Sequence, residues 1–246
     1  TSKLNSRSAS ILEKMIIPEH YIEKIQIAYP NLALDRLELN QDGMNNDVVI
    51  VNQQLVCRFP KTDWAKDELA NEVKILQVIQ RFIDLPIPRL DRVEDDFVSY
   101  PFIRGEPLSR HQLLRLDYRE QEKVIEQLGQ FYQQLHSIPG DVIAASSIAS
   151  SVAERSREEM LALYEQVQQI LFPFLWKHQR TWIHEHFEPL VSGSLNLDAS
   201  VVLIHGDLGC YHILFDPEKQ VISGIIDFGT AGMGDPAIDL AALLDN

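Results

Sequence analysis

The stretch from residue 203 to residue 241 constrains the fold more than any other part of the chain. It places two acidic side chains, Asp207 and Asp227, in short polar stretches, and His212 follows Asp207 by five residues. Apolar, β-branched runs flank these residues and predict short strands, at 201–204, 212–215 and 221–227. The sequence therefore predicts that the two aspartates lie on adjacent strand ends.

The intervals between these residues are those of a protein kinase. Asp207 and His212 have the spacing of the base and the metal-binding asparagine in the kinase catalytic loop, H-R-D-L-x-x-x-N, and residues 227–229 reproduce the D-F-G tripeptide. Phosphoryl transfer needs a carboxylate near the attacking hydroxyl, one or two metal ions that bridge the phosphates, and a cation on the nucleotide. Two aspartates on adjacent strand ends supply the first two of these parts. The pattern indicates a phosphotransferase.

Four longer segments follow one another over nearly the whole chain: CRFPK…NEVKIL, PFIRGEPL, HGDLGCYHILFD and IIDFGTAGMGDPAIDLA. In sequence and order they resemble the aminoglycoside phosphotransferase family, and most closely its 2″-modifying branch. The resemblance implies that Asp207 orients or deprotonates the acceptor hydroxyl, that His212 and Asp227 bind Mg²⁺, and that ATP or GTP is the co-substrate. His212 departs from the commoner asparagine, although the 2″-modifying branch is similar in having histidine there. Imidazole is a softer ligand than an amide oxygen, so a merely structural hydrogen bond stays open for His212.

The predicted fold class is α+β, a protein-kinase-like two-lobed fold with a small β-rich N-terminal lobe and a larger helical C-terminal lobe. We assign residues 1–99 to the nucleotide-binding lobe, 100–105 to a hinge and 106–246 to the catalytic lobe. We expect the catalytic lobe to continue beyond Asn246, because the helix that opens at Asp235 has barely begun there.

Apolar periodicity predicts the elements of both lobes. β-Branched runs indicate two N-terminal hairpins, one over 47–59 with its turn at Asn52 and Gln53, the other over 91–100. Helical spacing of apolar residues predicts three helices, over 63–83, 118–137 and about 151–176.

Glu72 falls on the apolar face of the first of these helices, three residues after Leu69 and four before Leu76. A carboxylate on that face is desolvated unless it meets a cation, so a basic side chain should approach it. Arg58 is the candidate, at the position where kinases carry the lysine that touches the nucleotide phosphates and pairs with a helix glutamate. Lys61 is a rival phosphate contact. The plain alternative is an exposed strand-edge arginine and an ordinary solvated glutamate.

Three further residues are candidates for the nucleotide site. Gly43 is the only glycine in NQDGMNNDVVIV, where a kinase covers the phosphates with a loop, although a hairpin turn explains it equally. In VSYPFIRGEPL a strand runs into a connector, where a kinase hinge offers backbone groups to the purine. Pro101 cannot donate a hydrogen bond, so we expect the Tyr100 carbonyl and the Phe102 N–H to face the base. An ordinary interlobe linker is the alternative.

Other conspicuous residues have simpler interpretations. His205 resembles a loop-fixing residue, and Asp235 is expected to cap a helix. Asp239 lies in the apolar start of the last helix, where the family resemblance implies a hydrogen bond to the catalytic loop from beneath. The three tryptophans are expected to be packing residues rather than a substrate cage: Trp64, Trp176 and Trp182.

Composition narrows the partners and the location. A formal net charge of −14 argues against nucleic acid, because a phosphate backbone requires clustered lysine and arginine. No apolar run approaches the ~20 residues of a membrane helix, and the N-terminus carries no signal pattern. Cys57 and Cys210 lie in unlike contexts and fit neither a disulfide framework nor a metal site. We expect a cytoplasmic monomer with reduced thiols that contacts no membrane.

The acceptor is the least determined part of the function. Acidic residues of the predicted helices favour a small, hydroxylated, polycationic amino sugar: Glu154, Glu158, Glu159, Glu185 and Glu188. With such an acceptor, antibiotic resistance is the function to test, and the sequence leaves open whether it results. The motifs fix only the donor side, so a kinase for a macrolide, choline-like amine, amino alcohol or sugar stays open. So do a nucleotide-binding pseudo-kinase and, more distantly, a metal-dependent hydrolase.

Overall fold

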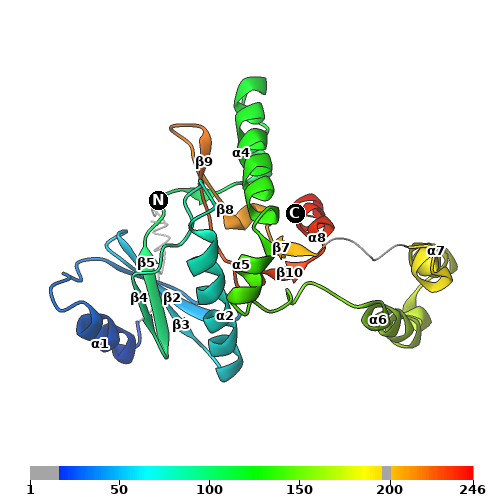
Figure 1. Ribbon diagram of the computed structural model, residues 1–246, viewed down its shortest axis with the longest axis horizontal. Helices are drawn as coiled ribbons and strands as arrows, with labels where there is room; N and C mark the ends of the chain where they lie inside the picture. The colour runs from blue at the N-terminus through cyan, green and yellow to red at the C-terminus, as the bar shows by residue number, and fades with distance from the viewer. Residues whose placement is uncertain (1–16, 196–200, 246) are drawn as a thin grey trace, which may run out of the picture.

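The computed structural model describes residues 17–195 and 201–245 (Figure 1). Its N-terminal region is built on a five-stranded antiparallel sheet with the order β1-β2-β3-β5-β4. The strands are β1 (Leu37–Asn40), β2 (Asn46–Val51), β3 (Leu55–Pro60), β4 (Arg92–Glu94) and β5 (Phe97–Pro101). Helix α1 (Glu19–Ala28) packs on this sheet through a buried cluster that contains Ile25, Val49, Phe59 and Phe97.

The hairpin of β2 and β3 forms where the sequence predicts it. Every second residue of β2 is buried, as the two-residue period of a strand requires. Asn52 and Gln53 both take positive φ angles, 53° and 52°, and the N–H of Gln54 donates to the Val51 carbonyl at 2.9 Å. Two successive positive φ angles are typical of a type I′ turn, whose twist matches that of the strands. The predicted turn at Asn52 and Gln53 is confirmed.

Helix α2 (Asp63–Ile79) follows β3 directly. Thr62 caps it, because its hydroxyl accepts the N–H of Ala65 at 3.1 Å. The α-helix ends four residues before the predicted end at Ile83. The chain continues there as a turn, in which the N–H of Ile83 donates to the Ile79 carbonyl at 3.1 Å. The buried face of α2 is the link between the sheet and the rest of the molecule.

Helices dominate the chain after the connector at 102–105. They are α3 (Arg110–Leu113), α4 (Tyr118–His136), α5 (Gly140–Ala145), α6 (Arg157–Ile170), α7 (Lys177–Ser192) and α8 (Pro236–Asp245). None of the helices in the described part of the chain is long and apolar enough to cross a membrane. Two small sheets complete the region: β6 (Glu106–Pro107), β8 (Ile213–Asp216) and β9 (Val221–Ile225) in one, β7 (Val202–Ile204) and β10 (Gly232–Gly234) in the other.

One hydrophobic core joins α2 and α4 to the small sheets. Its members come from all of these elements: Ile75, Ile79, Phe131, Leu135, Leu203, Phe215 and Ile225. Figure 1 shows α2 between the N-terminal sheet and α4. The ends of β7 and β9 are therefore held at the junction of the two regions. The arrangement is the predicted α+β class, and the division at residues 99 and 105 stays a proposal.

The third predicted helix begins later than expected. Instead of 151–176, α6 runs from Arg157 to Ile170, because Ser156 and Glu159 form a capping box at its start. The residues before it are held elsewhere: the Ser151 N–H donates to the Met233 carbonyl at 2.9 Å, and its hydroxyl donates to the Thr230 carbonyl at 2.6 Å.

The expectation that the tryptophans pack in the interior is wrong. Trp64, Trp176 and Trp182 are 59%, 74% and 67% exposed. Trp176 directly precedes α7 and Trp182 lies within it, and Figure 1 shows α6 and α7 as a pair that projects from the rest of the molecule. Trp64 lies in α2 instead, so exposed tryptophans occur in both regions of the molecule.

Candidate active site

The loop after β7 is fixed by its backbone. Gly206 has φ 81°, and a Cβ atom there would lie 2.7 Å from the Ser151 hydroxyl and 2.9 Å from the Thr230 carbonyl, so only glycine fits. Asp239 of α8 is fully buried, and its carboxylate accepts the N–H groups of His205 at 3.2 Å and Gly206 at 2.8 Å. His136 of α4 contacts the same carboxylate at 2.8 Å. The backbone just before Asp207 is therefore held in one conformation.

His205 is buried in this loop and faces inward. Its Nε2 lies 3.2 Å from the Ile226 carbonyl, and its ring packs 4.7 Å from that of Phe228. Its Nδ1 is buried and has no hydrogen-bond partner among the described residues. Burial lowers the pKa of His205 below its ordinary 6.5, so folding favours the neutral form of the ring.

We expect the free energy of unfolding to fall as the pH drops below 6.5. The unfolded chain protonates His205 with its ordinary pKa of 6.5, whereas the folded chain takes up that proton only at lower pH. One histidine contributes a slope of at most about 1.4 kcal/mol per pH unit. Urea denaturation at several pH values compares the parent with His205→Gln, whose amide N–H replaces that of Nε2. A variant with the parent's slope would contradict the assignment.

His212 is oriented by the same loop. Its Nδ1 lies 2.6 Å from the Asp207 carbonyl, and a carbonyl oxygen only accepts, so Nδ1 carries the proton. The lone pair of the neutral ring is then on Nε2, which lies 3.5 Å from the Asp227 carboxylate. Two acceptors that face each other at this distance call for a positive charge between them, from a proton or a metal ion.

Asp227 lies two residues after the end of β9, in a left-handed conformation with φ 65°. Aspartate tolerates this region better than most residues, and the next residue in the chain maintains the conformation. Phe228 is fully buried in the core, and its N–H donates to Glu72 Oε1 at 3.2 Å. Helix α2 is thereby tied to the segment that carries Asp227.

Arg58 and Glu72 form the expected buried ion pair. Arg58 Nη1 lies 2.6 Å from Glu72 Oε1, and Nη2 lies 3.8 Å from Asp227 Oδ1. Glu72 is 1% exposed, and its Oε2 has no partner among the described residues. Burial opposes the charge of Arg58, but Glu72, Tyr100 and Asp227 outweigh it and raise its pKa. The guanidinium therefore stays charged and links two carboxylates.

All the site residues nominated from the sequence line one cleft of about 540 Å³: Gly43, Arg58, Glu72, Tyr100, Phe102, Asp207, His212 and Asp227. Apolar side chains line it as well, among them Val48 and Val56 of the large sheet and Leu214 and Ile226 of the C-terminal region. A cavity of this size that combines apolar walls with several polar groups is typical of a small-molecule site. No group of three or more histidine, cysteine, aspartate or glutamate side chains forms a metal cage in residues 17–195 and 201–245.

Glu68 is a member of this cleft that the sequence analysis missed. Its carboxylate accepts a hydrogen bond from the Asn45 amide at 2.6 Å, and burial together with Asp227 raises its pKa. The signal was available, because Glu68 precedes Glu72 by four residues and so shares its helix face.

The expectation for the connector needs a correction. The Phe102 N–H donates to the Gln54 carbonyl at 2.8 Å, so a ligand finds this donor already engaged. Phe102 still lines the cleft through its other atoms. Tyr100 pairs with Val56 in the sheet, and burial raises the pKa of its hydroxyl to about 12. The sheet extends one residue pair further than the sequence indicates.

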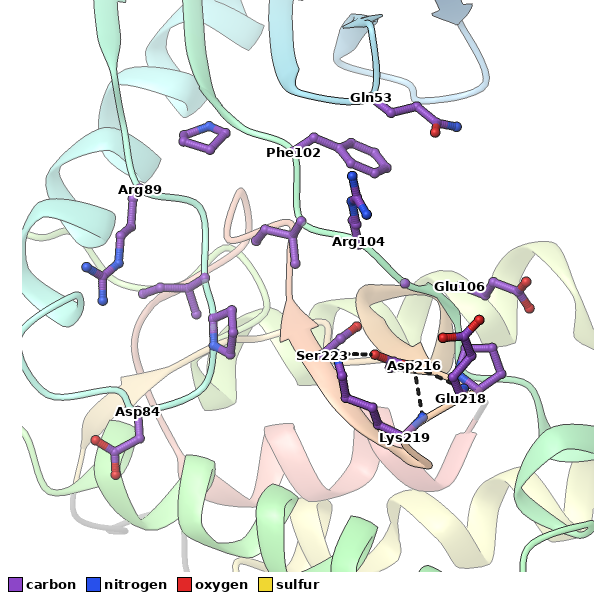
Figure 2. A pocket seen from close by; sticks show the side chains of 16 residues that line it. Gln53, Asp84, Arg89, Phe102, Arg104, Glu106, Asp216, Glu218, Lys219 and Ser223 are labelled. Atoms are coloured by element: carbon purple, nitrogen blue, oxygen red, sulfur yellow. Dashed lines mark hydrogen bonds and ion pairs between the residues drawn. The ribbon is translucent and has the colours of Figure 1, made fainter.

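A larger cavity of about 980 Å³ lies on the connector, between segment 84–89 and the β8–β9 hairpin. Figure 2 shows Arg89 and Arg104 on different sides of the connector strand, and Lys219 beside Asp216. The latter pair is an ion pair of 2.9 Å. Neither Asp207 nor Asp227 lines this cavity. We therefore place the chemistry in the smaller cleft.

Comparison with known proteins agrees with this geometry. A model described as the phosphotransferase enzyme family matches residues 36–246. The chain belongs to that family. The phosphotransferase is an enzyme that moves phosphate to a hydroxyl of a small molecule, and its α+β, kinase-like fold is the one predicted.

Relatives of the phosphotransferase include enzymes named for different acceptors. Viomycin phosphotransferase of Streptomyces vinaceus is 27% identical over 213 residues, which are 82% of this chain and 70% of the relative. The GDP and kanamycin complex of APH(2″)-IIIa has a TM-score of 0.81 at 27% identity and covers 93% of this chain and 78% of that one. Macrolide 2′-phosphotransferase type I shares the fold, with a TM-score of 0.67 at 21% identity over 92% of this chain and 77% of that one.

Proposed function

We propose that this phosphotransferase moves the terminal phosphoryl group of ATP or GTP to a hydroxyl of an aminoglycoside-like amino sugar. The observation that supports the proposal most is the convergence of Asp207, His212 and Asp227 with the Arg58–Glu72 pair on one cleft. These groups supply what phosphoryl transfer needs, a carboxylate for the hydroxyl, ligands for a cation and a charge for the phosphates.

Asp207 takes the role of the base that orients the acceptor hydroxyl and removes its proton. It is exposed to the cleft, so an incoming hydroxyl can reach its carboxylate. Asp227 and His212 Nε2 would hold Mg²⁺, because both are acceptors and they face each other. The proton of the His212 ring is on Nδ1, which leaves Nε2 free to bind the ion. Mg²⁺ prefers few protein ligands and keeps phosphate oxygens and water for the rest. When bound, it neutralises charge on the phosphates.

The nucleotide lies between the two regions in this proposal. The purine packs between the apolar walls of the cleft, next to Tyr100 and Phe102. Arg58 faces the phosphates with the guanidinium that it already holds against Glu72 and Asp227, and a planar fork suits bidentate contact with phosphate. The loop around Gly43 covers the phosphates from the large sheet.

Acidic side chains on α6 and α7 favour a cationic acceptor. Glu158, Glu185 and Glu188 are exposed on these helices. Two others serve the fold instead, because Glu154 accepts the Asp235 N–H at 2.7 Å and Glu159 closes the capping box of α6. The exposed carboxylates would attract a polycation through their negative electrostatic potential rather than through contacts in a pocket.

A kinase for a different acceptor is the second candidate. The relatives carry the names of viomycin, kanamycin and macrolide enzymes, so the family's donor side serves several acceptors. A pseudo-kinase is less favoured, because Asp207 and Asp227 both remain in the cleft. Free Cys57 and Cys210 and a nucleotide co-substrate fit action in the cytoplasm.

We expect Mg²⁺-dependent transfer of label to one class of acceptor. The protein is incubated with labelled ATP or GTP and a panel of aminoglycosides, macrolides, choline-like amines, amino alcohols and sugars. A chelator in excess should abolish the transfer, and added Mg²⁺ should restore it, since the cation neutralises the phosphates. Label on macrolides or amino alcohols alone would favour the second candidate. Nucleotide binding without transfer to any acceptor would favour a regulatory role.

A further inference from the structure

Lys61 lies between β3 and α2, at the edge of the proposed nucleotide site, and its ammonium group contacts the loop between β1 and β2. Its Nζ donates to the carbonyls of Gln41 at 2.9 Å and Gly43 at 2.6 Å. Asp47 Oδ1 lies 3.3 Å from Nζ and forms an ion pair with it. Two of the three donors of the ammonium group are thus used by loop carbonyls, and its charge is paired with a carboxylate of the protein. The sequence analysis kept Lys61 as a rival phosphate contact, and this geometry gives it another task.

These contacts orient the loop between β1 and β2. The peptide group is planar and trans, so its C=O and the following N–H point in opposite directions. When Lys61 holds the Gly43 carbonyl, the Met44 N–H points away from Lys61. That N–H has no acceptor among the described residues, and Met44 lines the cleft. A free backbone N–H in a turn is a donor for an anion.

The far end of the loop is held as well. The Asn45 carbonyl accepts the backbone N–H of Lys61 at 2.9 Å. The Asn45 amide donates to Glu68 of α2 at 2.6 Å. The loop is thus fastened to the backbone of Lys61 and to α2.

Asp47 anchors Lys61 from the interior. It is 6% exposed, and its Oδ2 accepts the Tyr21 hydroxyl at 2.9 Å and the Gln41 amide at 3.1 Å. Tyr21 belongs to α1, so the network runs from α1 through Asp47 and Lys61 to the loop. A buried, multiply bonded carboxylate gives Lys61 one fixed position.

We propose that Lys61 is a positioning residue, which fixes the loop at 41–45 so that the Met44 N–H faces the phosphates of the nucleotide. The inference rests on the proposed nucleotide site, but not on the identity of the acceptor. It assigns Lys61 a part in nucleotide affinity without contact to the nucleotide.

The test compares Lys61→Met with Lys66→Met. Lys66 pairs with Asp63 at the surface of α2, so its variant removes the same charge and leaves the loop alone. We expect Lys61→Met to raise KM for the nucleotide by about 10-fold, the size of a lost charged hydrogen bond. The KM for the acceptor should stay unchanged, and kcat should fall by less than about 3-fold. Lys61→Arg should recover part of the affinity, because it keeps the charge and several donors. Lys66→Met should match the parent.

Asp47→Asn separates positioning from direct contact. The variant keeps an oxygen for Tyr21 but weakens the hold on Lys61. If Lys61 positions the loop, KM for the nucleotide rises in Asp47→Asn too, and the double variant with Lys61→Met adds little, since both belong to one network. If Lys61 turns to the phosphates, Asp47→Asn leaves KM unchanged or lowers it, and the proposal is overturned. An unchanged KM in Lys61→Met overturns it as well.

Calorimetric titration with ADP or GDP gives the same comparison without any acceptor. A protein that binds nucleotide but transfers no phosphate would refute the proposed function and still test Lys61. Thermal melting of each variant verifies that it is folded.

Discussion

Asp207→Asn is expected to lower kcat by ~10²–10⁴-fold, the range of general-base effects. Asparagine keeps the size of the side chain but cannot take the proton of the acceptor hydroxyl. The dissociation constant of the nucleotide should change by less than about 3-fold, because Asp207 is not one of the groups that we assign to the phosphates. Steady-state kinetics with the acceptor found in the panel, together with calorimetric nucleotide titration, measures both quantities.

Asp63→Asn is the matched control for Asp207→Asn. Asp63 is fully exposed in the first turn of α2 and pairs only with Lys66 in the described structure. Asp63→Asn removes the same charge at a position away from the acceptor hydroxyl, so it should keep the kcat of the parent. If Asp207→Asn turned over as fast as the control, Asp207 would not be the base.

Glu72→Leu is expected to cost about 3–5 kcal/mol in the free energy of unfolding, because it leaves Arg58 charged and buried beside a single distant carboxylate. The Phe228 N–H also loses its acceptor. The double variant Arg58→Met/Glu72→Leu should recover most of the stability, since an apolar pair of similar volume replaces the ion pair. It should bind nucleotide far more weakly, because no cation is left for the phosphates.

Urea denaturation measures the stability of both variants, and calorimetry measures their nucleotide affinity. If Glu72→Leu lowered the free energy of unfolding by less than about 1 kcal/mol, the Arg58–Glu72 pair would contribute no more than a solvent-exposed ion pair does. Full nucleotide affinity in the double variant would show that Arg58 is structural alone. The two measurements therefore separate the two roles of Arg58.

The sequence predicted those parts of the site that depend on spacing within one segment. Asp207, His212 and Asp227 line one cleft because each lies within three residues of a short strand, and the intervals between them were readable in the sequence. The pairing of Arg58 with Glu72 was also predictable, since a carboxylate on an apolar helix face requires a cation. In these cases the local pattern and the fold impose the same solution.

The sequence did not predict contacts that join distant segments through backbone atoms. The Phe102 N–H is used by Gln54, and the Lys61 ammonium by two carbonyls of a loop, because backbone acceptors leave no trace in residue types. The exposure of Trp182 is a similar case, since aromatic residues usually pack. The start of α6 is different: the S-x-x-E pattern from Ser156 to Glu159 was visible and predicts a helix start there.

Arg58 has a consequence for chemical probes of this enzyme. Reagents that carry an acyl phosphate on a nucleotide label kinases by acylating a lysine amine next to the phosphates. In the proposed site the guanidinium of Arg58 takes that position, and its raised pKa leaves no free nitrogen lone pair to react. No lysine is present among the described residues that line the cleft. Covalent inhibitors designed around that amine would find no nucleophile here, whereas reversible, anionic scaffolds would meet a fixed cation.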